Sequence, residues 1–299
     1  MSIDVIPLPG VTFGAEVSGL DLRRTSDGDW EAVERAFHTY GVLIFHAQRL
    51  DREQHIAFAR RFGRIERQSD QTMSADLVGK PVVLNISNVD ENGELITHRD
   101  HPQTRYLGGN EGWHSDSSFK PASAKASVLM ALETPGKGGQ TGYADMRAAF
   151  DALDESEQRY LRGLTAYHSL EYSQTAVGAV DGKAAAVPSD MAGAWHRLVR
   201  VHPATGRPSL FIGRHACQIR ELGVAEGQRL LGRLLEEACR PPRVYYHAWR
   251  PGDVVVWDNR CMLHRATEWD LNERRVLRHV RVAGDSRRPA PVPVEGAVQ

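Results

Sequence analysis

Cysteine is scarce in this chain. Three residues, Cys217, Cys239 and Cys261, occur among 299. Their number is odd and no two of them form a C-x-x-C pair, which argues against a disulfide framework and against a structural zinc site. Proteins of a reducing compartment keep their few thiols free, so we expect a protein of the cytoplasm.

An excess of charge of one sign is also missing. Lys plus Arg number 37 against 38 for Asp plus Glu. A broad basic surface for nucleic acid or anionic lipid is therefore not expected. The first residues, MSIDVIPLPG, have neither a basic start nor an apolar run, and no apolar stretch approaches the roughly 20 residues that span a bilayer. We expect the partner to be a small molecule, with no role for nucleic acid or a membrane.

Neither an internal repeat nor a long Ser/Gly linker divides the sequence. This favours a single domain over residues 1–299. Apolar residues make up 41% of the chain, which is enough to bury a real core. We further expect this domain to form a homo-oligomer.

Strand patterns dominate the chain, and helical patterns interrupt them without regular alternation. Helices are predicted near 27–40, 51–62, 146–162 and 224–239. Ser26 or Asp27 can cap the first of these and Gly41 can end it. Strands are predicted at 11–22, 42–46, 82–87, 126–133, 209–213, 244–249, 253–258 and 275–284. This order indicates a mainly β protein with added helices (α+β), built as a sandwich or jelly-roll barrel.

Two polar, glycine-rich stretches, 88–112 and 173–196, do not fit a compact core. Loops of that length are often lids or binding segments. We expect them to cover a functional site.

The stretch EGWHSDSSF, residues 111–119, carries His114 and Asp116 two positions apart in a β-prone segment. Successive side chains of a strand point to opposite faces, so both would project from one face and could bind one ion. A His-x-Asp tripeptide also arises by chance, as a hydrogen-bonded histidine beside a turn aspartate. The interpretation therefore depends on a third ligand.

His264 is the candidate for that ligand, because it follows closely after an apolar strand that ends at Trp257. Two histidines and one carboxylate suit non-haem Fe(II), since they leave other positions open for substrate and oxygen. Zinc could bind the same three residues, so a zinc metallohydrolase is an alternative. His114, Asp116 and His264 are thus the predicted metal ligands and catalytic centre.

Arg275 follows His264 by eleven residues, in a strand whose period of two places Arg275, His279 and Arg281 on one face. If that face lines a barrel, the arginine needs an anion, and its planar fork matches a carboxylate. The alternative is an exposed strand arginine that pairs with a glutamate.

Four motifs, WHSDSSF, GGQTGYADM, WDNRCMLHRA and RRVLRHVRVAGD, occur here in an order and spacing typical of one family. The sequence closely resembles the taurine/2,4-dichlorophenoxyacetate dioxygenases, which depend on Fe(II) and 2-oxoglutarate, from FGAEVSGLDL to VAGD. The resemblance implies a double-stranded β-helix, a form of jelly roll, with Fe(II) on His114, Asp116 and His264. It also implies that Thr141 and Arg275 hold the far carboxylate of 2-oxoglutarate. With O2 this co-substrate would drive hydroxylation of a C–H bond and leave succinate and CO2.

The family resemblance also bears on the substrate, a small organic acid. The taurine branch carries an arginine for the sulfonate fifteen residues after the last metal histidine, where this chain has His279. Stretches such as YHSLEYSQ and HPATGRPSLFIGRHA resemble instead the aryloxyalkanoate branch, which hydroxylates the carbon beside an ether oxygen. The expected substrate is therefore 2,4-dichlorophenoxyacetate or a phenoxypropionate. Its carboxylate would lie near His279 and Arg281, and its ring under 173–196.

Two further side chains are candidates for substrate contact. Asn110 matches a substrate-contact position of the taurine branch, and Trp113 adjoins a predicted metal ligand. A turn-forming asparagine and an aromatic in ordinary packing explain them equally well. A taurine or alkylsulfonate dioxygenase and a catalytically silent barrel that binds a small acid also remain open.

Overall fold

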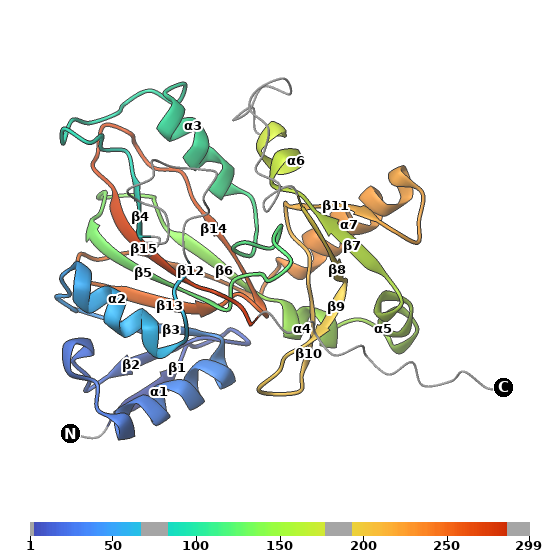
Figure 1. The fold of residues 1–299 in the computed structure, drawn as a ribbon, viewed down its shortest axis with the longest axis horizontal. Coiled ribbons are helices and arrows are strands. Elements are labelled where there is room, and N and C mark those ends of the chain that lie inside the picture. Colours follow the sequence, from blue (N-terminus) through green and yellow to red (C-terminus); the bar gives the residue numbers. More distant parts are fainter. Residues whose placement is uncertain (1–2, 67–82, 177–192, 286–299) are drawn as a thin grey trace.

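The computed structural model describes residues 3–66, 83–176 and 193–285. Its largest sheet has seven strands, of which only the β2–β3 pair is parallel. In spatial order they are β1 (Asp4–Pro7), β2 (Ala15–Ser18), β3 (Val42–Phe45), β13 (Val254–Asp258), β5 (Ala126–Glu133), β15 (Val276–Val282) and β4 (Val83–Ser87). A second sheet contains β12 (Val244–His247), β6 (Thr141–Asp145) and β14 (Met262–Ala266). The two sheets are drawn in Figure 1, and residues of both line one cavity.

The central strands of the large sheet are buried on both faces. In β5, Val128 and Met130 belong to a hydrophobic cluster that also contains residues of the two N-terminal helices. Leu129 and Ala131 belong to another hydrophobic cluster, which includes residues of the second sheet. Alternate side chains of a strand point to opposite faces, so both faces must be apolar. This explains why these strands have continuous apolar runs in the sequence.

Two helices, α1 (Asp27–Tyr40) and α2 (Arg52–Arg61), cover one face of the large sheet (Figure 1). The Ser26 side chain accepts from the backbone N–H of Asp29, and the Asp29 carboxylate accepts from that of Ser26. Gly41 ends α1 in the left-handed region, at φ 74°. These boundaries confirm the predicted helices at 27–40 and 51–62.

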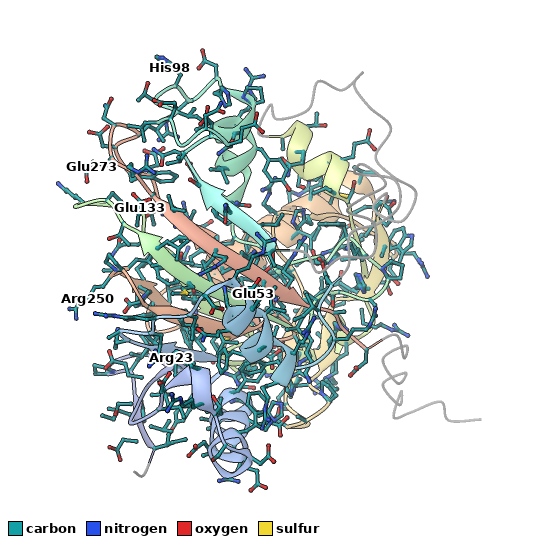
Figure 2. The ribbon with its side chains drawn as sticks, turned by 60° about the vertical axis from the view of Figure 1, so that its left-hand side comes forward. Arg23, Glu53, His98, Glu133, Arg250 and Glu273 are labelled. Atoms are coloured by element: carbon teal, nitrogen blue, oxygen red, sulfur yellow. The ribbon has the colours of Figure 1, made fainter. Side chains whose placement is uncertain are left out.

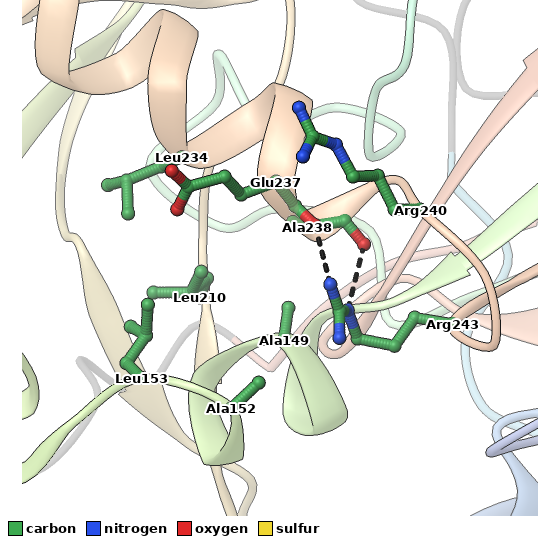
Figure 3. A pocket seen from close by; sticks show the side chains of 9 residues that line it. All are labelled: Ala149, Ala152, Leu153, Leu210, Leu234, Glu237, Ala238, Arg240 and Arg243. Atoms are coloured by element: carbon green, nitrogen blue, oxygen red, sulfur yellow. Dashed lines mark hydrogen bonds between the residues drawn. The ribbon is translucent and has the colours of Figure 1, made fainter.

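A second lobe packs beside the two sheets. It contains α4 (Met146–Asp151), α5 (Glu155–Arg162), α7 (Val224–Ala238), a sheet of β11 (Ala216–Ile219), β7 (Thr165–His168) and β8 (Ala194–Arg197), and the pair β10 (Pro208–Leu210) and β9 (Val199–Val201). Figure 3 shows the hollow between α4 and α7, where Arg243 donates to the carbonyls of Glu237 and Ala238. Arg243 thereby satisfies backbone acceptors at the end of α7.

Several sequence expectations were wrong in detail. The stretch 111–119 is not a regular strand, because His114 forms an isolated bridge with His264 and a turn follows in which Ser117 has φ 54°. The predicted loop 88–112 contains α3 (Pro102–Gly108) and the short helix η3 (Gly109–Glu111). The predicted loop 173–196 includes the end of α6 (Leu170–Thr175) and the start of β8, while 177–192 lies outside the described residues.

The class predicted from the sequence, mainly β with added helices, is confirmed by these elements. Charged side chains such as Arg23, Glu53 and Glu133, labelled in Figure 2, are exposed. Within the described ranges, no helix combines the length and the apolar character that crossing a membrane requires.

His55 on α2 makes stability depend on pH. It is fully buried, and burial, followed by the nearby Arg278 and His279, lowers its pKa to about 3. Below the ordinary histidine pKa the unfolded chain gains a proton that the native state does not, so stability falls as the pH drops from about 6.5 toward 3. When the pH is lowered from 7 to 5, we expect the free energy of unfolding to fall by about 2 kcal/mol less in His55→Leu than in the wild type.

Urea denaturation at the two pH values measures this difference. His98→Leu, at an exposed position (Figure 2), is the matched control and should follow the wild type. Equal pH dependence in His55→Leu and the wild type would rule out this role of His55.

Candidate active site

The three predicted metal ligands meet in one place. Ligand atoms of His114, Asp116 and His264 all lie within 4.8 Å of one another, and each residue is buried. His264 lies on β14, where its backbone exchanges two hydrogen bonds with His114, at 3.0 and 2.8 Å. This pairing brings together two segments that are far apart in the sequence.

Hydrogen bonds orient the ligands. His114 Nδ1 lies 2.7 Å from the carbonyl of Gly112, so Nδ1 carries the proton and Nε2 is free to bind a metal. Ser127 donates its hydroxyl to Asp116 Oδ2 at 2.6 Å. The Asn259 amide donates to Ser127 and accepts from the backbone N–H of Asp116, at 2.9 and 3.0 Å. Asp116 is thus held by its side chain and by its backbone.

The protonation states suit a divalent cation. Burial is the main reason that the pKa is lowered to about 3 in His114 and about 4 in His264. Burial by itself raises the pKa of Asp116, but His264, His279 and Arg281 together lower it below its usual range. At neutral pH the centre therefore offers two neutral imidazoles and one carboxylate, as metal binding requires. This donor set fits Fe(II), and its chemistry alone would also accept zinc.

A second group of similar composition contains His202, Asp258 and Cys261. Hydrogen bonds and an ion pair within the protein already occupy its histidine and its aspartate. His202 donates from Nε2 to Asp258 at 2.9 Å, and its Nδ1 accepts backbone N–H groups of the following turn. Arg260 also binds Asp258, and burial raises the pKa of the Cys261 thiol. We interpret this cluster as structural, because its possible ligand atoms are occupied or protonated.

The three predicted metal ligands line a cavity between the seven-stranded sheet and the second sheet. Its apolar walls include Leu84, Leu129 and Trp257 from three strands of the large sheet. Thr141, the first residue of β6, and Arg275, just before β15, also line it. The structure therefore brings the expected anchors of 2-oxoglutarate into the same cavity as the metal ligands.

Arg275 is placed to bind an anion in the cavity. Its side chain is buried, its Nε donates to the Gly139 carbonyl at 2.9 Å, and its guanidinium lies 4.9 Å from the centre of the Trp269 ring. A Cβ at Gly139, which has φ +62°, would lie 3.0 Å from Arg275 Cδ, so glycine permits this approach. Burial lowers the pKa of Arg275 to about 10, and the group stays charged at neutral pH.

The Nη1 atom of Arg275 is buried and has no hydrogen-bond partner among the described groups. A buried, unpaired guanidinium N–H is costly. A carboxylate bound in the cavity would satisfy it, which is the role that the resemblance implies.

Trp113 does not line the cavity. Its ring lies 6.1 Å from that of Tyr246, and the guanidinium of Arg265 lies 5.6 Å from its centre. Asn110, by contrast, lies in the cavity wall. The structure thus places one of the two candidates from this segment at the cavity and the other outside it.

His279 and Arg281 both line the cavity beside the predicted metal ligands. His279 Nε2 is 3.6 Å from the Asp116 carboxylate, and burial lowers the pKa of His279 to about 4, which leaves it neutral. Arg281 Nε and Lys120 Nζ each lie 3.5 Å from the same oxygen of Glu66. Two cations share the Glu66 carboxylate, and Arg281 also lowers the pKa of Asp116.

Arg214 was missed by the sequence analysis. It donates to the carbonyl of Gly109 in η3 and, at 2.7 Å, to that of Ser173 in α6. It thereby joins these two helices, and Asn110 of η3 reaches the cavity. A lone loop arginine carries no local pattern that would have predicted these partners.

The comparisons with known proteins agree with this geometry. A model of the family described as "Taurine catabolism dioxygenase TauD, TfdA family" matches residues 4–282. The chain belongs to this family. Among TauD/TfdA relatives, it is 46% identical over 290 residues to the (S)-phenoxypropionate/alpha-ketoglutarate-dioxygenase of Sphingobium herbicidovorans, which covers 95% of this chain and 96% of that protein.

A second TauD/TfdA relative is the alpha-ketoglutarate-dependent 2,4-dichlorophenoxyacetate dioxygenase of Cupriavidus pinatubonensis, 39% identical over 96% of this chain and 99% of that protein. Among solved structures, AAD-2 in complex with Mn(II) and N-oxalylglycine matches with a TM-score of 0.85 and 37% identity, over the whole of both chains. The resemblance seen in the sequence motifs is confirmed.

Proposed function

We propose that this protein uses Fe(II), 2-oxoglutarate and O2 to hydroxylate aryloxyalkanoates of the 2,4-dichlorophenoxyacetate or phenoxypropionate type. The observation that carries the proposal is one cavity that holds both the triad of His114, Asp116 and His264 and the buried Arg275, whose Nη1 has no partner among the described residues. The class of enzyme follows from the family: it is a 2-oxoglutarate-dependent dioxygenase. The names of the relatives support the substrate class.

In this proposal the residues of the cavity have separate roles. His114, Asp116 and His264 hold the iron, while Arg275 and Thr141 bind the far carboxylate of 2-oxoglutarate. The bound iron, with 2-oxoglutarate and O2, supplies the oxidant for a C–H bond. The apolar walls exclude water and position the aryl ring.

The overall reaction balances. One oxygen atom of O2 enters succinate, formed with CO2 from 2-oxoglutarate, and the other is inserted into the C–H bond of the carbon between the ether oxygen and the carboxylate, which then carries a hydroxyl. The resulting hemiacetal breaks its bond to the aryloxy group, which leaves as a phenol, and the remaining fragment is a 2-oxo acid.

Arg281 is proposed to attract the substrate carboxylate, with neutral His279 and Asn110 as polar neighbours. We expect Arg281→Met to raise the KM for the aryloxyalkanoate by about tenfold, because one charged contact is lost. The KM for 2-oxoglutarate should stay near its wild-type value. Initial rates at varied concentrations of each acid measure both constants, and an unchanged KM for the aryloxyalkanoate would exclude this anchor.

A substrate panel tests the proposed function. It contains both enantiomers of 2-phenoxypropionate, 2,4-dichlorophenoxyacetate and taurine, scored by release of phenol, sulfite and succinate. We expect phenol from the aryl ethers at the higher kcat/KM. Sulfite from taurine at a higher kcat/KM would favour the taurine and alkylsulfonate alternative, for which no carboxylate is needed.

The finer architecture is part of the proposal. Antiparallel sheets on both sides of the cavity support a double-stranded β-helix, the jelly-roll form. A single domain over residues 1–299, a homo-oligomer and a cytoplasmic location stay predictions.

A further inference from the structure

Thr141 makes a hydrogen bond whose direction is fixed by chemistry. Nε1 of Trp249 lies 2.9 Å from Thr141 Oγ1. An indole N–H only donates, so the hydroxyl oxygen accepts and its own proton is left for another acceptor. Thr141 is buried in the cavity wall and donates to no protein group in the described part of the chain. The proton is therefore available to a molecule in the cavity.

The turn that carries Trp249 is folded around a buried carboxylate. Asp253, 1% exposed, accepts from His46 Nδ1 at 2.8 Å, from His247 Nε2 at 3.0 Å and from the backbone N–H of Arg250 at 3.0 Å. The His247 ring meets the indole of Trp249 edge-on, with ring centres 4.7 Å apart. These contacts hold the indole where it reaches Thr141.

We propose that Trp249 is a positioning residue for the 2-oxo acid co-substrate. Its N–H keeps the Thr141 hydroxyl turned as a donor toward the far carboxylate, and Arg275 offers its unpaired Nη1 in the same cavity. Together they present donors alone, which suits an anion and does not help an acid without a second carboxylate. The inference rests on the proposed function, because it takes Thr141 and Arg275 as the anchors.

Trp249→Phe keeps an aromatic ring beside His247 and removes the N–H. The Thr141 hydroxyl then loses its donor and can rotate away from the ligand. We expect the Kd for N-oxalylglycine, measured by calorimetry on the Mn(II)-loaded protein, to rise about three- to tenfold. Trp195→Phe, at a position 38% exposed on β8, is the matched control and should leave this Kd unchanged.

A double-mutant cycle separates an effect through Thr141 from general loosening of the site. In a Thr141→Val background Trp249→Phe should have no further effect, whereas in Thr141→Ser, which keeps the hydroxyl, the effect should persist. The KM for 2-oxobutyrate, which lacks the far carboxylate, should not change. If Trp249→Phe fails to fold, 3-benzothienylalanine at position 249 keeps a bicyclic ring without the N–H and replaces it in the cycle.

An unchanged Kd in the Trp249 variant, or losses that add in the Thr141→Val background, would overturn the inference while leaving the proposed function intact. Failure of the wild type itself to bind N-oxalylglycine would instead count against the proposed function.

Discussion

Alanine in place of His114, Asp116 or His264 is expected to abolish turnover and to weaken Fe(II) binding by at least about 100-fold. Each variant leaves two protein ligands, which seldom hold iron in a site with open positions. Equilibrium titration of Fe(II) under anaerobic conditions, with succinate release measured in parallel, checks both effects.

His98→Ala is the matched control for the two histidine variants, because His98 is exposed at the periphery (Figure 2). It should bind iron and turn over as the wild type does. Unchanged iron affinity in all three ligand variants would mean that the metal lies elsewhere.

Arg275→Ala is expected to raise the KM for 2-oxoglutarate at least tenfold. Loss of one partner from a desolvated charge pair typically costs about 2–5 kcal/mol, and Arg275 is buried with no partner for Nη1 among the described residues. Initial rates at varied 2-oxoglutarate, with the aryloxyalkanoate saturating, measure the effect.

The neighbouring Arg274 offers a sharp control. Its guanidinium is exposed and pairs with Glu133 at 2.7 Å, on the outside of the sheet. Arg274→Ala should leave the KM for 2-oxoglutarate unchanged. A KM for 2-oxoglutarate that is similar in Arg275→Ala and the wild type would show that Arg275 does not bind the far carboxylate.

Strand periodicity predicted much of the site. The predicted period of two put Arg275, His279 and Arg281 on one face, and all three line the cavity. Arg275 nevertheless lies just before β15, and the pairing of β15 with β5 shifts register between Val276 and Leu277. Local signals also placed the first helix: Ser26, one of the two predicted caps, begins α1, and Gly41 ends it as expected. Such features could be predicted because they depend on residues close together in the sequence.

Other features depend on partners far along the chain. The segment 111–119 holds its two predicted metal ligands through an isolated bridge to β14 and a left-handed Ser117, neither of which a strand pattern reveals. Glu66, which pairs with Arg281, carries no local sign of that contact. The short strand β6, which contains Gly142, was missed because it lacks an apolar run.

The most direct test of the account measures the products of one reaction. The purified protein is incubated in air with Fe(II), ascorbate, 2-oxoglutarate and (S)-2-phenoxypropionate, and succinate and phenol are quantified together. We predict equal amounts of both products, with phenol release absent when 2-oxoglutarate or iron is omitted. Phenol release that needs zinc and no 2-oxoglutarate, or no succinate with any aryloxyalkanoate, would contradict it.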